Sequence, residues 1–238
     1  MRVNLSIEAR MTSTRLPGKV LMPAAGVPLL EIQLKKVKQC RLVNNVLVAT
    51  TTNSTDDPIV ELCKRLDVPY FRGSEPDVLQ RVVDAHKKFG TELIVELTGD
   101  NPLQDPALVD QCVRHFLDNE FDYVSNSGPN RKYPDGMNVQ VFPLKVLEEA
   151  CRETSDPKFH EHVSMYIYRS GKYKLSYIGP ESPELIWPEL NFTVDTRPEY
   201  EFVKAVTEQF SDINFSLRDL IGIVRSKPEL LYILRKQP

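Results

Sequence analysis

The sequence predicts an α/β fold, with a mostly parallel, twisted, Rossmann-like sheet that is flanked by helices. Segments with a strand pattern and segments with a helix pattern alternate four times between residues 3 and 117, and short connections separate them. Such alternation favours parallel strands joined by right-handed crossovers. A chain of 238 residues, 41% of them hydrophobic, is also long enough to bury one large core. We therefore expect a single domain over residues 1–238.

Each expected element follows from its hydrophobic period. The first four strands are residues 3–7, 46–50, 68–71 and 92–97, and the helices that follow them are residues 28–40, 56–66, 75–89 and 105–117. Lys36 and His86 are expected on the solvent-facing sides of their helices.

The pattern becomes less regular after Ser125. Further strands are expected at residues 137–142, 173–178 and 190–194, and further helices at residues 144–151, 158–169, 199–210 and 217–225. Because residues 130–189 depart most from the alternation, we expect them to form a smaller elaboration within the domain.

Composition excludes several classes of protein. The formal net charge of −3 gives no general attraction to nucleic acid. The four cysteines form no C-x-x-C pair, which argues against a zinc ribbon and a disulfide framework. The N-terminus has no apolar stretch of signal-peptide length, and nothing approaches a membrane span. We therefore expect a cytoplasmic protein with reduced thiols and no membrane or nucleic-acid partner.

A basic loop, residues 9–19, directly follows the first strand. Its cations are Arg10, Arg15 and Lys19, and its hydroxyl groups include Ser13 and Thr14. Arg grips phosphate oxygens in pairs, Lys supplies a compact charge, and loop N–H groups add donors. The alternative is a solvated basic turn. However, this loop and Thr98-Gly99-Asp100 both lie at the carboxyl ends of expected parallel strands, where ligands bind in such sheets.

Seven runs of residues occur in an order that resembles a known family. They are residues 9–19, 48–52, 56–60, 71–79, 98–103, 133–136 and 192–196. Together they resemble the cytidylyltransferases that make CMP-activated sugars, and most of all the branch named after the spore coat polysaccharide protein SpsF. That branch is related to the CMP-Kdo and CMP-sialic acid synthetases. The resemblance extends from Ile7 to about Tyr200.

The resemblance implies a reaction and roles for the loop. An acceptor oxygen attacks the α-phosphate of CTP in line, and pyrophosphate leaves. The catalytic and metal-binding residues implied are Arg10, Lys19, Asp100 and Asp195, with Arg15, Ser13 and Thr14 completing the triphosphate site. Asp100 and Asp195 suit Mg²⁺, which takes few carboxylates beside phosphate oxygens and water. Each aspartate also suits a turn or a helix cap.

The same resemblance places the nucleobase over the end of the first strand. The residues that it implies there are the backbone of Ala9 and the side chains of Arg72, Ser74 and Asp77. Arg72 has a second interpretation, as the surface ion-pair partner of Glu75.

An acceptor, a sugar or a sugar acid, is expected against the elaboration. The polar residues proposed for it are Tyr133, Asp135, Asn138, Gln140, Glu161 and His162. For Glu161 and His162, helix capping or an inter-subunit contact is the alternative. The resemblance also implies a homodimer.

Other functions stay open. Glu8 and Thr98 depart from the residues common in related enzymes, so the donor can be GTP or another triphosphate, and the acceptor can be phosphorylated. A GT-A glycosyltransferase shares the fold class, but Gly99-Asp100-Asn101 lacks the D-x-D metal motif. A non-catalytic nucleotide-binding protein would not need Lys19 and Asp195 intact.

Overall fold

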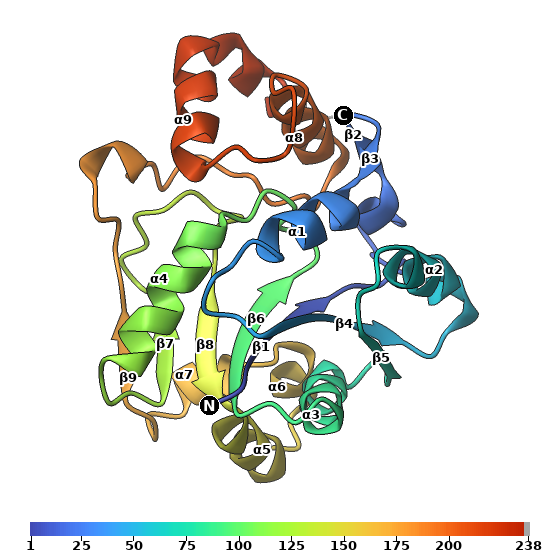
Figure 1. Cartoon of the computed structure of the whole chain (residues 1–238), viewed down its shortest axis with the longest axis vertical. Coiled ribbons are helices and arrows are strands. Elements are labelled where there is room, and N and C mark those ends of the chain that lie inside the picture. Colours follow the sequence, from blue (N-terminus) through green and yellow to red (C-terminus); the bar gives the residue numbers. More distant parts are fainter. Residues whose placement is uncertain (236–238) are drawn as a thin grey trace.

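The computed structural model describes residues 1–235, and within them a seven-stranded sheet lies between two layers of helices (Figure 1). The strand order is β5-β4-β1-β6-β8-β7-β9. The strands are β1 (Val3–Glu8), β4 (Asn45–Thr51), β5 (Tyr70–Gly73), β6 (Leu93–Thr98), β7 (Tyr123–Ser125), β8 (Gln140–Pro143) and β9 (Leu175–Tyr177). β5, β4, β1 and β6 are parallel, and β9 is parallel to β7. β8 is antiparallel to both of its neighbours. The predicted fold class is confirmed.

The centre of the sheet is buried on both faces, which explains the apolar runs in β4 and β6, whereas β1 alternates and also buries the polar residues Asn4 and Ser6. Leu5 of β1 is in register with Val46 of β4 and with Val95 of β6. This in-register pairing aligns the carboxyl ends of the central strands, so the loops that follow them meet at one edge.

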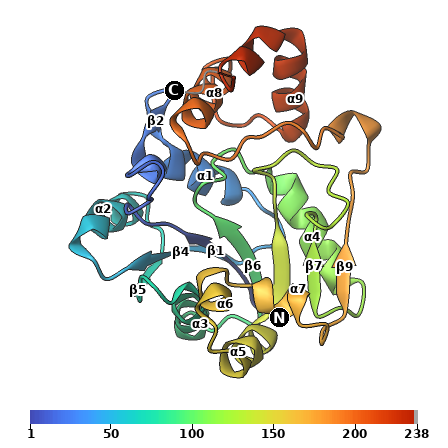
Figure 2. The ribbon, with the colours of Figure 1, turned by 180° about the vertical axis from the view of Figure 1, so that it is seen from behind.

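The helices form two layers (Figures 1 and 2). One layer contains α1 (Leu29–Val37), α2 (Asp57–Arg65) and α4 (Pro106–Leu117), and its core continues into α8 (Arg197–Thr207) and α9 (Leu217–Ser226). The other contains α3 (Val78–Lys88), α5 (Leu144–Glu153), α6 (Pro157–Glu161) and α7 (Met165–Arg169). A short hairpin, β2 (Pro23–Ala24) and β3 (Val27–Pro28), which we did not predict, packs beside α8.

Local chemistry sets where several helices begin. Asp105 precedes α4 and accepts a hydrogen bond from the Ala107 N–H at 2.9 Å. Thr196 and Glu199 form a capping box at the start of α8.

Two expected elements are wrong. The helix predicted over residues 158–169 is split into α6 and α7, because His162 has an extended backbone with φ −115° and ψ 91°. The strand predicted over residues 190–194 is reduced to one bridge between Asp135 and Asn191, because Val194 N–H instead donates to the Asp100 carbonyl at 2.8 Å.

Two side chains that we expected in solvent are buried. Lys36 donates to the Phe215 carbonyl at 2.6 Å, and burial lowers the pKa of its ammonium to about 8. His86 contacts Thr91 through Nδ1 at 2.9 Å, and burial lowers its pKa to about 3. The four cysteines are free thiols, as predicted. Among residues 1–235, no helix combines the length and apolar character needed to span a membrane.

Candidate active site

The basic loop is anchored by a buried carboxylate, Asp56. Asp56 accepts hydrogen bonds from the Met11 N–H at 2.8 Å and from the Thr50 hydroxyl at 3.1 Å. We had predicted Asp56 only as the start of a helix. Further along the loop, Gly18 has φ 73° and donates to the Met11 carbonyl at 2.9 Å. This left-handed turn, which glycine adopts without strain, leads the chain into Lys19.

Lys19 lies between the two acidic residues that we predicted as metal ligands. Its Nζ is 2.8 Å from Asp195 Oδ1 and 3.5 Å from Asp100 Oδ2. Arg15 is 2.9 Å from the same Asp195 oxygen. Gly99 lets β1 and the Asp100 turn approach closely, since a Cβ there would lie 2.8 Å from the Glu8 carbonyl oxygen. The sequence prediction that these separate segments meet is therefore matched by the geometry.

A cavity of about 310 Å³ opens over this cluster, and we call it the anion cavity. The predicted residues that line it are Ala9, Arg10, Ser13, Thr14, Arg15, Lys19, Asp100, Glu161, His162 and Asp195. The Lys19 side chain is only 11% exposed, whereas the Arg15 side chain is 63% exposed. Lys19 is thus enclosed between the two aspartates, while the Arg15 side chain has more room to follow a ligand.

Three further charged residues lie at or behind the lining of the anion cavity. From the sequence we considered only Glu8, for its bearing on the choice of base, and assigned none of the three to the site. Glu8 and Arg81 line the cavity, and Glu96 lies behind Glu8. Burial raises the pKa of Glu8 to about 7 and raises that of Glu96 well above its ordinary value. Each carboxyl group has a buried oxygen with no other hydrogen-bond partner among the described residues, and a proton shared between the two groups would satisfy both oxygens. A charged residue on the buried stripe of the predicted helix 75–89 was the available signal for Arg81.

Three residues predicted for the nucleobase lie outside the anion cavity. Arg72 is held by the Thr51 carbonyl at 2.8 Å, by the Asn53 carbonyl at 2.7 Å and by the Asp57 carboxylate at 2.7 Å. Its ion-pair partner is therefore Asp57, and the suggested pair with Glu75 is wrong.

Ser74 and Asp77 have structural partners. The Ser74 hydroxyl accepts from the Asp77 N–H at 3.1 Å, and Asp77 caps α3 through the Gln80 N–H at 2.9 Å. Asp77 also contacts His160 Nδ1 at 2.8 Å. The structure thus gives both side chains a role in fixing the start of α3.

The predicted acceptor residues separate into three groups. Glu161 and His162 border the anion cavity. Tyr133 is 1% exposed, and its hydroxyl lies 3.0 Å from Gln111 Oε1, so it packs between α4 and the chain that follows β9. Asp135 pairs with Arg131 at 2.9 Å.

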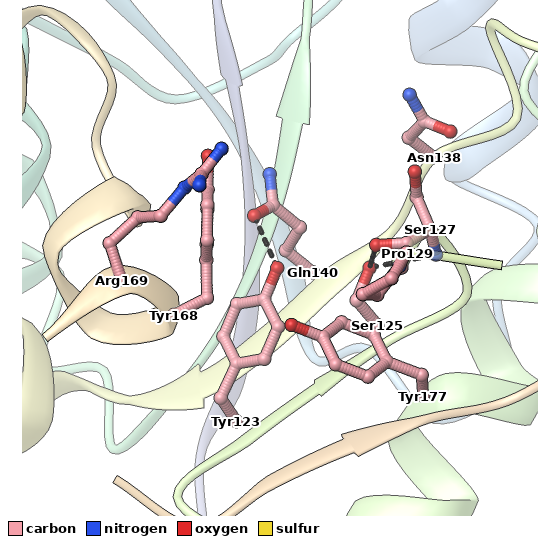
Figure 3. A pocket seen from close by; sticks show the side chains of 10 residues that line it. Tyr123, Ser125, Ser127, Pro129, Asn138, Gln140, Tyr168, Arg169 and Tyr177 are labelled. Atoms are coloured by element: carbon pink, nitrogen blue, oxygen red, sulfur yellow. Dashed lines mark hydrogen bonds between the residues drawn. The ribbon is translucent and has the colours of Figure 1, made fainter. Parts of the chain in front are cut away.

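Asn138 and Gln140 line a second, larger cavity of about 570 Å³, which we call the tyrosine cavity (Figure 3). Its other main walls are Tyr123, Tyr168, Arg169 and Tyr177. The Gln140 Oε1 atom accepts from the Tyr123 hydroxyl at 2.7 Å.

A cation-lined cavity beside two carboxylates, at the carboxyl edge of a Rossmann-like sheet, is the arrangement of a nucleotidyltransferase. A family model described as Cytidylyltransferase matches residues 6–214. The chain belongs to this cytidylyltransferase family, and it is an enzyme of the nucleotidyltransferase class.

Individual relatives agree with this assignment. The spore coat polysaccharide biosynthesis protein SpsF of Bacillus subtilis is 32% identical over 233 residues, which are 94% of each chain. A solved cytidylyltransferase from Leptospira borgpetersenii serovar Hardjo-bovis is 34% identical, with a TM-score of 0.92 over 100% of this chain and 98% of that one. A CMP:2-keto-3-deoxy-manno-octonic acid synthetase, solved in complex with CTP, shares the fold with a TM-score of 0.66 at 18% identity, over 88% of this chain and 99% of that one.

Proposed function

We propose that the protein transfers CMP from CTP to a sugar or a sugar acid, with release of pyrophosphate, in the synthesis of a surface polysaccharide. The observation that carries the proposal is the placement of Lys19 within 3.5 Å of both Asp100 and Asp195, with Arg10 and Arg15 in the same cavity. Cations that converge beside two carboxylates suit a triphosphate and its metal ion. The likeness to SpsF supports the pathway, and the CTP complex of the synthetase supports the donor.

Lys19 and the two arginines would contact different phosphate groups of the triphosphate. The Lys19 side chain is mostly buried, so it suits the phosphate groups nearest the sheet. Arg10 and Arg15 are more exposed, and they can close over the outer phosphates and stabilise the leaving pyrophosphate. Catalysis of this kind depends on positioning and on neutralising charge.

The donor set fits Mg²⁺. Two carboxylates reach one point from separate segments, and this small number of protein ligands leaves positions for phosphate oxygens and water. Asp100 and Asp195 would hold the ion, which when bound would polarise the α-phosphate. Lys19 Nζ now lies between them, so it has to move toward the phosphates when an ion binds.

The test is pyrophosphate release across a panel of CTP, GTP, ATP and UTP with neutral, acidic and phosphorylated sugars, with and without Mg²⁺. We expect release that needs CTP, an acceptor and Mg²⁺ together. Release with GTP alone would keep the class of reaction and change the base. No release with any pairing would contradict the proposal.

Lys19→Ala is the sharpest variant for this reaction. Because Lys19 would neutralise charge in the transition state from within the anion cavity, we expect the turnover number to fall at least about 100-fold. The matched control is Lys145→Ala, which removes an exposed lysine of α5 far from the anion cavity. Circular dichroism checks that both variants fold. An unchanged rate in Lys19→Ala would remove its assigned role.

A further inference from the structure

The tyrosine cavity opens at the same edge of the sheet as the anion cavity. Ser125 and Tyr177 are the carboxyl ends of β7 and β9, and Gln140 is the amino end of the antiparallel strand β8. All three residues line the tyrosine cavity (Figure 3). A molecule bound there therefore lies over the strand ends that also carry the anion cavity.

One segment, residues 161–169, contributes to the lining of both cavities. Glu161 and His162 line the anion cavity, and Tyr168 and Arg169, seven residues further along, line the tyrosine cavity. Between them the Ser164 hydroxyl donates to Gln140 Oε1.

Residues of the sheet also lie between the two cavities. Glu96 of β6 is in register with Gln140 of β8, and Glu96 contacts Glu8, which lines the anion cavity. Gln140 of β8, Glu96 of β6 and Glu8 of β1 thus lie on three adjacent strands, between the lining of one cavity and the lining of the other.

The lining of the tyrosine cavity suits a hydroxylated ring. The rings of Tyr168 and Tyr177 are partly exposed, and such faces pack against the C–H faces of a sugar. Gln140 Oε1 is already an acceptor for two hydroxyls, which fixes its NH₂ group as a donor toward the cavity. Aromatic surface with a few placed polar groups is typical of a small-molecule site.

The charge in the tyrosine cavity is positive. Arg169 is the formally charged residue in its lining, and no carboxylate lines it in the part of the chain that the structure describes. Within residues 1–235, Arg169 has no ion-pair partner, and its guanidinium lies 5.9 Å from the centre of the Tyr168 ring. A guanidinium in this position can bind a carboxylate or a phosphate through two parallel hydrogen bonds.

We propose that the tyrosine cavity binds the acceptor, and that the acceptor is a hydroxylated ring with an oxyanion, a carboxylate or a phosphate, held by Arg169. This inference rests on the proposed transferase function, because it places the second substrate of that reaction. It assigns specificity to Arg169, Gln140 and Tyr177 rather than to Tyr133 and Asp135.

The test measures binding, so it does not depend on turnover. The dissociation constants of glucose, glucuronate and glucose 6-phosphate for the full chain are determined by ligand-observed NMR. We expect at least one of the anionic probes to bind about fivefold more tightly than glucose, as an exposed charge-assisted contact supplies. The tighter of the two anionic probes identifies the oxyanion.

Arg169→Gln should remove that preference. Lys174→Gln, a change of an exposed cation on the neighbouring segment that does not line the cavity, should retain it. Equal binding of all three probes, no saturable binding of either anionic probe, or a preference that survives Arg169→Gln would each overturn the inference. Failure of the transferase proposal would instead appear as absent pyrophosphate release, whatever the binding results.

A second variant tests the aromatic wall without removing a charge. A Cβ at Gly128 would lie 2.5 Å from a ring atom of Tyr177, so Gly128→Ala should push that ring from its place. We expect all three probes to bind more weakly by a similar factor, with the anionic preference kept. Gly179→Ala, where a Cβ would have its nearest contact at 3.8 Å, is the matched control. Unchanged binding in Gly128→Ala would remove Tyr177 from the site.

Discussion

At the scale of single residues, the carboxyl pair of Glu8 and Glu96 is the least ordinary feature of the protein. Both groups leave a buried oxygen without a donor among the described residues unless they share a proton. Arg81 faces Glu8 from α3, and Asp100 adds a negative charge from the turn after β6. Glu161 and His162 close the same cavity from the end of α6. At pH values between 4.5 and about 7 the pair therefore holds a proton that the unfolded chain has already released.

Glu8→Gln tests this shared proton through stability. Because the folded pKa of Glu8 is raised from 4.5 to about 7, the folded state binds more protons than the unfolded state in that window, and stability falls as pH rises through it. Glutamine does not titrate, so Glu8→Gln should not lose stability for this reason as the pH rises. The free energy of unfolding of the variant minus that of the parent should therefore increase by about 2 kcal/mol from pH 5 to pH 8. Urea unfolding at both pH values measures it.

Glu120→Gln, a change of an exposed glutamate before β7, is the control and should show no such pH dependence. If Glu8→Gln and its parent keep the same difference in stability at both pH values, the two carboxyl groups do not share a proton.

The sequence predicted which side chains converge where charge and position along the strands coincided. Lys19, Asp100 and Asp195 were expected together from their places after β1, after β6 and before α8, and their side chains converge. Arg72 was misplaced because its guanidinium is taken up by local carbonyl groups, which no spacing rule anticipates. Tyr168 and Arg169 were missed because they belong to a helix whose break was not foreseen.

At the scale of elements, the short helix α6 is held against α3 by His160. Its Nδ1 is 2.8 Å from Asp77 Oδ1 and its Nε2 is 2.8 Å from the Thr154 carbonyl, so both nitrogens donate when the ring is charged. The hydrogen bond to Thr154 and then the Asp77 carboxylate raise the pKa of His160. This contact places Glu161 and His162 at the anion cavity, which makes α6 a positioning element.

His160→Gln should reduce stability more at pH 6 than at pH 9. A raised folded pKa means that the stabilisation is fully present below the ordinary value of 6.5 and is lost as pH rises through the folded pKa. The side chain is partly exposed, so the expected effect at low pH is below about 1 kcal/mol. Thermal unfolding at the two pH values measures it, and a larger loss at pH 9 would contradict the assigned charge.

At the scale of the whole molecule, Asp105 joins the helical layer of the sheet to the C-terminal helices. Its carboxylate caps α4 and also accepts from the Leu217 N–H at 2.6 Å, at the first residue of α9. Lys36 on α1 supports the same junction through the Phe215 carbonyl. The alternating pattern predicted the parallel half of the fold closely. Hydrogen bonds between residues far apart in the sequence leave no periodic signal, so the packing of α8 and α9 could not be predicted.

Asp105→Ala should therefore loosen the junction as well as one helix end. Loss of a cap and of a buried hydrogen bond predicts destabilisation of about 2 to 3 kcal/mol, or about 4–12 °C in the melting temperature. Asp156→Ala, which removes only the exposed cap of α6, should cost less. Trp187, whose ring lies 5.5 Å from the Arg225 guanidinium of α9, provides a fluorescence reporter. Equal losses in the two variants would show that the junction adds nothing.

The position of Lys19 bears on the order in which substrates load. Within the chain itself, the ammonium of Lys19 and the guanidinium of Arg15 already balance the charges of Asp100 and Asp195. A bare divalent ion that arrives alone competes with these two cations and gains little. In the proposed reaction, the phosphates of a triphosphate that arrives with its ion would attract both cations, which would free Asp100 and Asp195 to hold that ion. In the proposed reaction, the resting ion pairs would thus disfavour a metal ion that binds before the nucleotide.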